Sequence, residues 1–582
     1  MTTLDLRPSA LLGLFFLSIS PAAAADILYV DAGLTTGAND GSSWADAYQG
    51  AGGLQLALAA AVSGDQLWVA DGVYKPTTGT SRSSVFQLKN GVEIYGGFSG
   101  GESALGDRPA IGTAVSVLSG DLLDNDGSNL RNDNSYHLLS GAGTNSTAVI
   151  DGFTVTGGNA NGSGNDNKGG GILCLAGANP TVQNCRFEGN RCTFGGGAGY
   201  INGTPSFTDC QFVSNIGGSY GGAFDIANAG AVRFDRCWFQ GNSAARAGAL
   251  EIFSTSGARI TNSVFTGNAS TGSGGGGALW VGFGNNVTIA NCTVVENTST
   301  NNATAGLLVS SNSMTVVNSI FFYNAGPGGA QNTVNQISGT PSVTYCVVEG
   351  GIAGTGNLST APTFESVIAG DYRLASGSVG VDAGKNSGVP AGIVLDLGGK
   401  PRFWDVQAVP DTGSGAAPVV DIGAFELDTP PVFTAFCYGN QLGILCPCGN
   451  DTFPGTPEGC ANSLGWGAKL STTGTNVYAN DDLGITITQA RPNQPSLLVQ
   501  GSVAIETTFK DGIFCMGNPT ERVEVILLDA NGNGSTSGSI ISGGNVPGPG
   551  VTRYYQAWYR DPATSPCGTG SNFSHALQID WL

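Results

Sequence analysis

Charged residues and histidine are both scarce in this sequence of 582 residues. Only 11% of the residues are charged, against roughly 25% in typical soluble domains. Glycine, asparagine, serine and threonine take the place of the residues that build long helices, so helix should be scarce. Hydrophobic residues still make up 41% of the chain, which is enough for a large core and excludes a disordered protein.

Basic residues are the rarer of the charged types. The chain has 23 Lys and Arg against 43 Asp and Glu, a formal net charge of -20. Because binding a nucleic-acid backbone requires Lys and Arg to displace counterions, we expect no nucleic-acid partner, and an anionic membrane surface is disfavoured for the same reason. An acidic polysaccharide should also be repelled overall, unless a metal ion such as calcium bridges the two sets of carboxylates.

Histidine occurs twice, at His137 and His575, in different proposed domains. This excludes a Ser-His-Asp or Cys-His catalytic arrangement and a site with several histidine ligands. No phosphate-binding loop or dinucleotide fingerprint is present. The chain also lacks an apolar run that could span a bilayer, because the run from Ala10 to Ile19 is half of the roughly 20 residues needed.

That short apolar run has the setting of a secretory signal. Arg7 precedes it, and Pro21 and a string of small residues ending at Ala25 follow it. We expect residues 1–25 to be removed and the mature chain to begin near Asp26. The protein should therefore be secreted or displayed at the cell surface, where its 13 cysteines meet an oxidising environment.

A repeat of about 27 residues runs through the middle of the chain. Its marker is Cys or Ser, usually preceded by Asn or Asp, and it stands at Cys185, Cys210, Cys237, Ser263, Cys292, Ser319 and Cys346. An apolar residue stands three positions before each marker, and an Asn follows the first six markers after five positions. A second column with a similar period consists of Gly171, Gly197, Gly222, Gly248, Gly277 and Gly306.

This period, with short β-type runs and no helix between them, predicts a right-handed parallel β-helix with three strands per coil. The Cys/Ser column should stack inside the coil as small, nearly apolar side chains, because Ser replaces Cys twice without breaking the pattern. We therefore expect Cys185, Cys210 and Cys237 to be neighbours without disulfide bonds. The Asn column should satisfy backbone groups at a corner.

Segments on either side of the repeats resemble secreted bacterial right-handed parallel β-helix proteins. The stretch DILYVDAGLTTG and its continuation to residue 76 resemble the N-terminal cap of that family, in which a short helix, here about 54–61, plugs the coil. GVEIYGG and VIDGFTVTGG are similar to its early coils, and residues 371–427 resemble its closing segment, the choice-of-anchor Q module. The resemblance covers about 26–427 and implies fold and compartment. It implies no activity, because the family resembles pectate lyases, adhesins and surface proteins alike.

We divide the chain into a signal peptide (1–25), an N-terminal cap with the first coils (26–110), the β-helix with its closing segment (111–428) and a C-terminal module (429–582). Alternating apolar runs between turn residues predict that the last module is a small β-sandwich. It contains six cysteines, for which we favour three disulfides over a redox or metal role: Cys437, Cys446, Cys448, Cys460, Cys515 and Cys567.

Strand alternation indicates one row of side chains on the outside of the coil. Counting from the glycine column, the second and fourth positions are apolar and should point inward, so the third should point outward. The third position reads Tyr200, Asp225, Glu251 and Trp280 in successive coils. Because coils stack at about 4.8 Å, the two carboxylates should be neighbours between aromatic rings. Such a row could bind a sugar, hold calcium or act as the acid pair of a retaining glycosidase.

Two further sets of residues are candidates. Arg233 and Arg259 should stack in one column, where a lyase would find its base or its carboxylate clamp, or where they would simply neutralise the acid pair. Asp529, Asn531 and Asn533 begin like a calcium loop, but an isoleucine stands where the closing Glu is needed. A plain hairpin turn is the favoured interpretation there.

We therefore expect a monomeric β-helix protein that binds carbohydrate or mediates adhesion without catalysis, with an extracellular polysaccharide or a cell-surface component as its partner. No cofactor is expected unless calcium takes part. One alternative is a polysaccharide lyase or glycoside hydrolase that uses the acids and arginines named above, and another is a rigid spacer. If the outer row is ordinary surface, the ligand site should lie in the C-terminal module around Tyr555 and Trp558.

Overall fold

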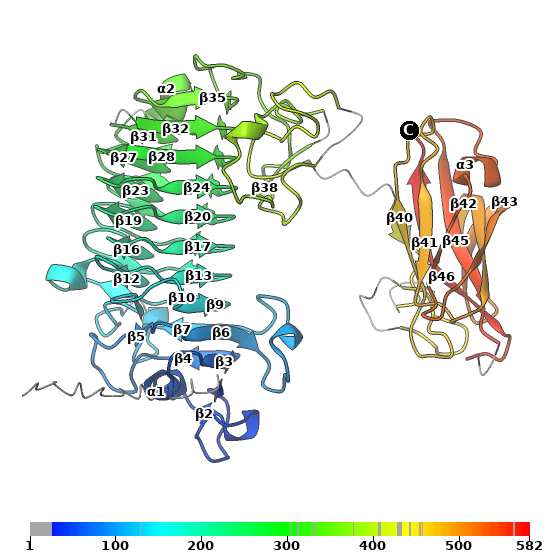
Figure 1. The fold of residues 1–582 in the computed structure, drawn as a ribbon, viewed down its shortest axis with the longest axis horizontal. Coiled ribbons are helices and arrows are strands. Elements are labelled where there is room, and N and C mark those ends of the chain that lie inside the picture. Colours follow the sequence, from blue (N-terminus) through cyan, green and yellow to red (C-terminus); the bar gives the residue numbers. More distant parts are fainter. Residues whose placement is uncertain are drawn as a thin grey trace, which may run out of the picture. The chain divides into compact units, whose positions relative to one another are not determined.

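The structure is a computed structural model. It describes residues 26–582 except 129, 284, 303, 311–312, 330–331, 376, 405–408, 428–432, 441–443, 453–455, 457 and 563–564. The signal peptide predicted at 1–25 lies outside the described residues. The chain divides into two compact units, Met1–Leu427 and Asp428–Leu582 (Figure 1).

The described residues of the first unit form three long parallel sheets. The first sheet contains β1 (Ile27–Asp31), β2 (Tyr48–Gln49), β3 (Gln66–Ala70), β6 (Glu93–Phe98), β9 (Val149–Asp151), β13 (Thr181–Gln183), β17 (Ser206–Thr208), β20 (Arg233–Asp235), β24 (Arg259–Thr261), β28 (Asn285–Ala290), β32 (Ser313–Val317) and β35 (Ser342–Thr344). The second contains β4 (Gly72–Tyr74), β7 (Ser116–Ser119), β10 (Phe153–Thr156), β14 (Arg186–Glu188), β18 (Gln211–Val213), β21 (Trp238–Gln240), β25 (Val264–Thr266), β29 (Thr293–Val295), β33 (Ile320–Phe322) and β36 (Val347–Val348).

The third sheet contains β5 (Phe86–Gln87), β8 (Leu139–Ser140), β12 (Ile172–Cys174), β16 (Gly199–Ile201), β19 (Phe224–Ala227), β23 (Leu250–Phe253), β27 (Leu279–Gly282), β31 (Leu307–Val309) and β34 (Ile337–Ser338). Along the repeats each strand pairs in parallel with the corresponding strand of the next coil. The unit is thus a right-handed parallel β-helix with three strands per coil, which confirms the fold predicted from the repeat.

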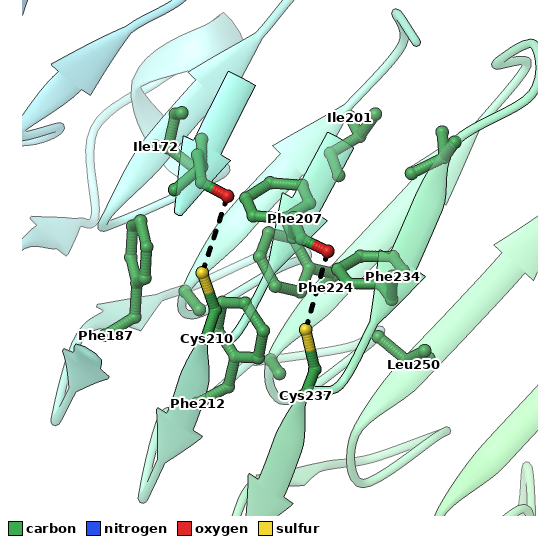
Figure 2. Packing of buried hydrophobic residues seen from close by; sticks show 14 of the residues in the cluster. Ile172, Phe187, Ile201, Phe207, Cys210, Phe212, Phe224, Phe234, Cys237 and Leu250 are labelled. Carbon is green, nitrogen blue, oxygen red and sulfur yellow. Dashed lines mark hydrogen bonds between the residues drawn. The ribbon is translucent and has the colours of Figure 1, made fainter. Parts of the chain in front are cut away.

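Apolar side chains stack inside the coil from one turn to the next (Figure 2). The rings of Phe207 and Phe234 are nearly parallel, with centroids 4.9 Å apart. Among these rings, the Sγ atoms of Cys210 and Cys237 each donate a 3.6 Å hydrogen bond to a backbone carbonyl of the preceding coil. These two cysteines and Cys185 are buried and free of disulfides, as predicted.

The residue before each Cys or Ser marker turns the corner between the first and second sheets. Its φ is close to +50°, for example 51° at Asn184, 54° at Asp209 and 48° at Asn262. Asn and Asp tolerate this left-handed conformation better than other side chains, which explains their frequency at this position. Arg236 also adopts it, with φ of 50°, and its guanidinium donates two hydrogen bonds to Asp209 of the preceding coil at 2.8 and 2.7 Å.

The Asn column forms a buried hydrogen-bonded ladder. Nδ2 of Asn215 donates to Oδ1 of Asn242 at 3.0 Å, and Nδ2 of Asn242 donates to Oδ1 of Asn268 at 2.9 Å. Each Nδ2 also donates to a backbone carbonyl of the preceding coil, and each Oδ1 accepts from the backbone amide of the preceding Asn. The ladder therefore pairs polar backbone groups that water cannot reach, as predicted for this column.

The glycine column lies where neighbouring coils approach closely. A Cβ atom on Gly222 would lie 2.0 Å from the carbonyl oxygen of Gly248, and one on Gly248 would lie 2.1 Å from that of Gly277. The obstacle is backbone in both cases, so only glycine fits.

Other segments of the chain contact the coil at both of its ends. Helix α1 (Gly53–Ala60) places Leu54 and Leu58 in the core at the N-terminal end, as the resemblance implied. At the other end, near α2 (Thr333–Gln336), Leu358 pairs with the last coil: its amide donates to the carbonyl of Cys346 at 2.8 Å, and its carbonyl accepts from Val348 at 2.9 Å.

The closing segment that follows contains an antiparallel pair, β37 (Phe364–Ser366) and β38 (Asp371–Leu374), and a fully buried arginine. Nε of Arg402 lies 2.8 Å from Oε1 of Glu426, and Nη2 donates to the carbonyls of Asp421 and Gly423 at 2.9 and 3.0 Å. Burial raises the pKa of Asp421 to about 6. Nδ2 of Asn262 donates to the carbonyl of Leu395 at 3.0 Å, which ties the segment to the coil.

Short pairings also form in the turns between the second and third sheets: β11 (Asn159–Ala160) with β15 (Arg191–Cys192), and β26 (Ala269–Ser270) with both β22 (Ser243–Ala244) and β30 (Thr298–Ser299). The described 3-10 helices are η1 (Trp44–Asp46), η2 (Leu105–Asp107), η3 (Asp126–Ser128), η4 (Gly164–Asn167), η5 (Pro327–Gly329) and η6 (Asn386–Gly388). None of the helices in the described ranges is long and apolar enough to cross a membrane.

The C-terminal unit is a small antiparallel β domain, consistent with the predicted sandwich. One sheet has the order β39 (Thr434–Phe436), β46 (Ser571–Asp580), β45 (Thr552–Arg560), β42 (Pro495–Phe509), β43 (Gly512–Leu527), and a second contains β40 (Lys469–Thr473), β41 (Gly484–Thr488) and β44 (Gly534–Ser535). A short helix, α3 (Ile540–Gly543), contacts β43. The six cysteines of the described unit form the three disulfides that we favoured, in the pairing Cys437–Cys515, Cys446–Cys460 and Cys448–Cys567.

Candidate functional site

The four residues of the predicted outer row lie side by side on the third sheet. Tyr200 is opposite Asp225, Asp225 is opposite Glu251, and Glu251 is opposite Trp280 in the parallel register of β16, β19, β23 and β27. The residues that flank them along each strand belong to the core, so the row faces outward from the coil. The structure therefore brings together the residues that the repeat register had grouped.

The row is nevertheless not an open surface, which corrects the sequence-based expectation. The exposed fractions are 7% for Tyr200, 3% for Asp225, 2% for Glu251 and 6% for Trp280. The four side chains are buried because the turns that lead into the third sheet cover them. Their backbones pair from coil to coil, for example at Tyr220 and Arg246, and their side chains fold back over the strands. Strand alternation predicts where a side chain points but not what covers it.

Arg246 is the centre of this cover. Its Nε donates to Oε2 of Glu251 at 3.0 Å, and its Nη2 donates to Oε1 of the same carboxylate. Its guanidinium carbon also lies 4.0 Å from the centroid of the Trp280 ring and 4.6 Å from that of Tyr220. The ring face that a sugar would need is therefore occupied by a cation.

Lys168 covers the other end of the row. Its Nζ lies 4.6 Å from the centroid of the Tyr200 ring and 5.3 Å from that of Phe194. Phe194 in turn meets Tyr220 edge-on, with centroids 5.1 Å apart. Cations and aromatic rings thus form one continuous layer over the two acids.

Asp225 lies beneath this layer. Burial, and secondarily the charge of Glu251, raises the pKa of Asp225 to about 7, although Lys168 and Arg246 act in the opposite direction. Burial likewise raises the pKa of Glu251, an effect that Arg246 opposes. The Asp225 carboxylate packs so closely against Gly195 that a Cβ there would lie 2.1 Å from Oδ2. Its carboxyl could exchange a proton near neutral pH, but a polysaccharide cannot reach it through the covering side chains.

The two predicted arginines are not part of this arrangement. Arg233 and Arg259 do stand opposite each other, but on β20 and β24 of the first sheet, whereas the acid pair lies on the third. Nη1 of Arg259 donates to the carbonyl of Ala391 at 3.4 Å. The ion pair of Glu251 is made by Arg246 instead, a residue for which the outer-row pattern gave no signal.

The candidate calcium loop is a turn in the structure. Oδ1 of Asp529 accepts hydrogen bonds from the amides of Asn531 and Asn533, both at 2.8 Å. The Asn533 side chain accepts from the amide of Gln489 at 3.4 Å. Across the described part of the chain, no group of three His, Cys, Asp or Glu side chains is placed to hold a metal ion.

A groove of about 680 Å³ lies in the C-terminal unit. The hairpin of β42 and β43 forms one wall, because its tip bends back over the sheet: the amide of Asp511 donates to the carbonyl of Ser571 at 3.2 Å, and its carboxylate accepts from Thr569 at 2.5 Å. The groove is lined by Pro495, Ser496, Leu497, Lys510, Arg522, Val523, Glu524, Val525, Trp558, Tyr559, Arg560, Thr569 and Ser571.

Trp558 supplies the aromatic surface of this groove. Alternation along β45 places Tyr555 and Tyr559 in the core, so Trp558 lies on the opposite face of the sheet. Its ring stacks on Phe573, with centroids 5.8 Å apart and planes at 17°, and meets Phe509 edge-on at 6.4 Å. Tyr555 is fully buried and donates to Gln500 at 2.7 Å, so Trp558 alone of the pair expected in this module lines the groove.

Comparisons with known proteins find only partial or distant similarities. No protein-family model matches this chain. Metabotropic glutamate receptor-like protein P of Dictyostelium discoideum is 31% identical over 102 residues, which are 17% of this chain and 7% of that protein's length. Among solved structures, pectate lyase Pel9A has a TM-score of 0.37 and 17% identity, covering 70% of this chain and 98% of its own. The enzymatically active domain of tailspike protein 2 from bacteriophage CBA120 has a TM-score of 0.26 and 10% identity, covering 96% and 76%.

Proposed function

We propose that this protein binds extracellular carbohydrate, or mediates adhesion through it, without catalysis of its own. The β-helix serves as a rigid scaffold, and the groove of the C-terminal unit is the binding site. The observation that carries this proposal is the placement of Trp558 in a groove whose remaining lining is mostly polar, charged or aliphatic. Ligand sites commonly combine an aromatic or apolar surface with a few placed polar groups.

An extracellular location belongs to the same proposal. Three disulfides in the C-terminal unit favour an oxidising compartment. The predicted signal peptide and the resemblance to secreted bacterial β-helix proteins, including the choice-of-anchor Q type of closing segment, point the same way. We propose that the protein acts as a monomer and needs no metal. Binding is measured with and without calcium to test the second point.

Polysaccharide cleavage at the outer row is the second candidate function. The observation that favours it is the Asp225 carboxyl, whose pKa of about 7 suits a general acid or base. The cover formed by Lys168 and Arg246 opposes it, because a substrate would have to displace both cations.

The test uses the full secreted chain and a panel of neutral and acidic polysaccharides, with and without calcium, scored for retention and for bond cleavage. Retention without cleavage is expected. Trp558→Leu, which keeps an apolar contact with Phe573 but removes the wide ring face, should weaken retention at least tenfold. Trp466→Leu is the matched control, because Trp466 is 46% exposed in the same unit and does not line the groove.

Three results would overturn the proposal. Release of unsaturated products or new reducing ends would show catalysis. Unchanged retention of polysaccharide by folded Trp558→Leu protein would show that the binding site lies outside the groove. Absence of retention for every polysaccharide would favour the interpretation of the β-helix as a spacer.

A further inference from the structure

Basic side chains gather at the groove although the chain as a whole is strongly acidic. The groove is lined by Lys510 at the hairpin tip, Arg522 on β43 and Arg560 on β45. These are half of the six Lys and Arg residues of Asp428–Leu582, which are Lys469, Arg491, Lys510, Arg522, Arg553 and Arg560. The three cations thus come from one hairpin tip and two different strands.

All three cations are exposed and available to a ligand. Within the described part of the unit, none of them forms an ion pair with a carboxylate, whereas Nζ of Lys469, outside the groove, lies 3.7 Å from Glu458. Nζ of Lys510 lies 5.7 Å from the centroid of the Phe509 ring, which in turn contacts the ring of Trp558.

Glu524 is the acid among the described lining residues, and its carboxylate is already engaged. Oε1 accepts from the Ser537 hydroxyl at 2.7 Å, and Oε2 accepts from the amide of Gly538 at 3.1 Å. Burial alone would raise the pKa of Glu524, but these donors lower it below the usual value. The Glu524 carboxylate therefore stabilises the turn at Ser537, and the three cations have no carboxylate partner among the described residues.

We propose that the groove binds a polyuronate, a polysaccharide whose sugars carry carboxylate groups. This inference rests on the proposed function and names its ligand class. A sugar ring stacks on Trp558, while Arg522 and Arg560 each pair with a carboxylate through two parallel N–H groups and Lys510 binds as a point charge. The net charge of -20 predicts repulsion of acidic polymers, but charges beyond about 8 Å are largely screened at physiological ionic strength, so the local cations decide the outcome.

The experiment compares acidic polymers with their uncharged esters. The full chain is titrated with alginate and with propylene-glycol-esterified alginate, and with polygalacturonate and its methyl ester. Each acidic form is expected to bind at least tenfold more tightly than its ester, and binding should weaken as salt is added. Single-stranded DNA serves as a polyanion without sugar carboxylates.

Charge variants locate the effect in the groove. Arg522→Gln and Arg560→Gln should each weaken binding of the acidic polymers about tenfold and should weaken binding of the esters much less. Arg553→Gln is the matched control, because Arg553 lies on the same strand, β45, but does not line the groove.

The outcomes separate this inference from the proposed function. Equal binding of acid and ester forms, both weakened by Trp558→Leu, would overturn the polyuronate assignment and leave the proposed function standing. Equal binding of DNA and polyuronates would overturn it in favour of a general polyanion site. Failure to bind any acidic or neutral polysaccharide would overturn both proposals.

Discussion

The guanidinium carbon of Arg246 lies 4.0 Å from the centroid of the Trp280 ring. The same guanidinium pairs with Glu251, the residue opposite Trp280 on the neighbouring strand. One side chain therefore covers the aromatic ring and neutralises the acid beside it. Acidic and aromatic residues in one row suggest a sugar-binding surface, but here Glu251 and Trp280 bind Arg246 and so hold its turn against the third sheet.

Arg246→Ala should destabilise the β-helix strongly. It leaves Glu251 buried without its partner, and breaking a buried ion pair costs about 3–5 kcal/mol. Urea unfolding followed by fluorescence measures the effect. Arg233→Ala is the control, because Arg233 is exposed on the first sheet, and its cost should stay within about 0.5 kcal/mol. Similar midpoints for the two variants would contradict the covering role of Arg246.

Asp225→Asn should remove part of the pH dependence of stability. The folded-state pKa of Asp225 is about 7, above the usual 3.8, so the folded protein holds a proton that the unfolded chain releases between these values. The stability associated with this proton is fully present below about pH 4 and is lost as the pH rises to about 7, by about 4 kcal/mol in all.

Urea unfolding of both proteins at acidic and at mildly alkaline pH tests this prediction. The wild type should lose more stability than Asp225→Asn as the pH rises. Glu365→Gln changes an exposed carboxylate on β37, and it should keep the wild-type dependence. The same slope in wild type and Asp225→Asn would show that Asp225 titrates normally.

The free cysteines should react with a thiol reagent only after unfolding. Burial raises the pKa of Cys174, Cys292 and Cys346 to about 12, so the reactive thiolate is scarce at neutral pH. The folded protein should therefore show almost no labelling. In guanidinium chloride without reductant, seven thiols per chain should react. A smaller number would mean that some of these seven cysteines are oxidised.

Asn242→Ala should weaken the coil by roughly 2–4 kcal/mol, because each buried polar group that loses its partner costs about 1–3 kcal/mol. The substitution removes the acceptor of Asn215 and the donor to the carbonyl of Phe212. Gln240→Ala, at an exposed position two residues earlier, provides the comparison. Thermal unfolding should separate the two variants clearly, and coincident transitions would argue against the ladder as a source of stability.

The inward-facing columns could be predicted from the sequence because each position meets its own equivalent in the next coil. A residue such as Asn242 or Gly248 must satisfy a neighbour of the same kind, so the constraint repeats and becomes visible as a period. The outer row was predictable in direction and register for the same reason. Its cover was not, because the position of Arg246 depends on how a glycine-rich turn folds.

The C-terminal groove shows the same limit. Alternation along β45 predicts that Trp558 and Arg560 share one face of a strand. Lys510 reaches the groove only because the hairpin tip bends over the sheet and bonds to Ser571, a contact between residues far apart in sequence. The pairing of the six cysteines is likewise set by this long-range folding, so the sequence predicts three disulfides but not their partners.

The pairing of Leu358 with the last coil bears on how these molecules behave at high concentration. An uncovered end of a parallel coil presents a row of unpaired amides and carbonyls, on which another chain could add strands and begin a filament. Here the amide of Val348 and the carbonyl of Cys346 are already bonded to Leu358 of the same chain. Strand addition to β36, the last strand of the second sheet, would first require Leu358 to leave this position, so the chain itself blocks growth at that edge.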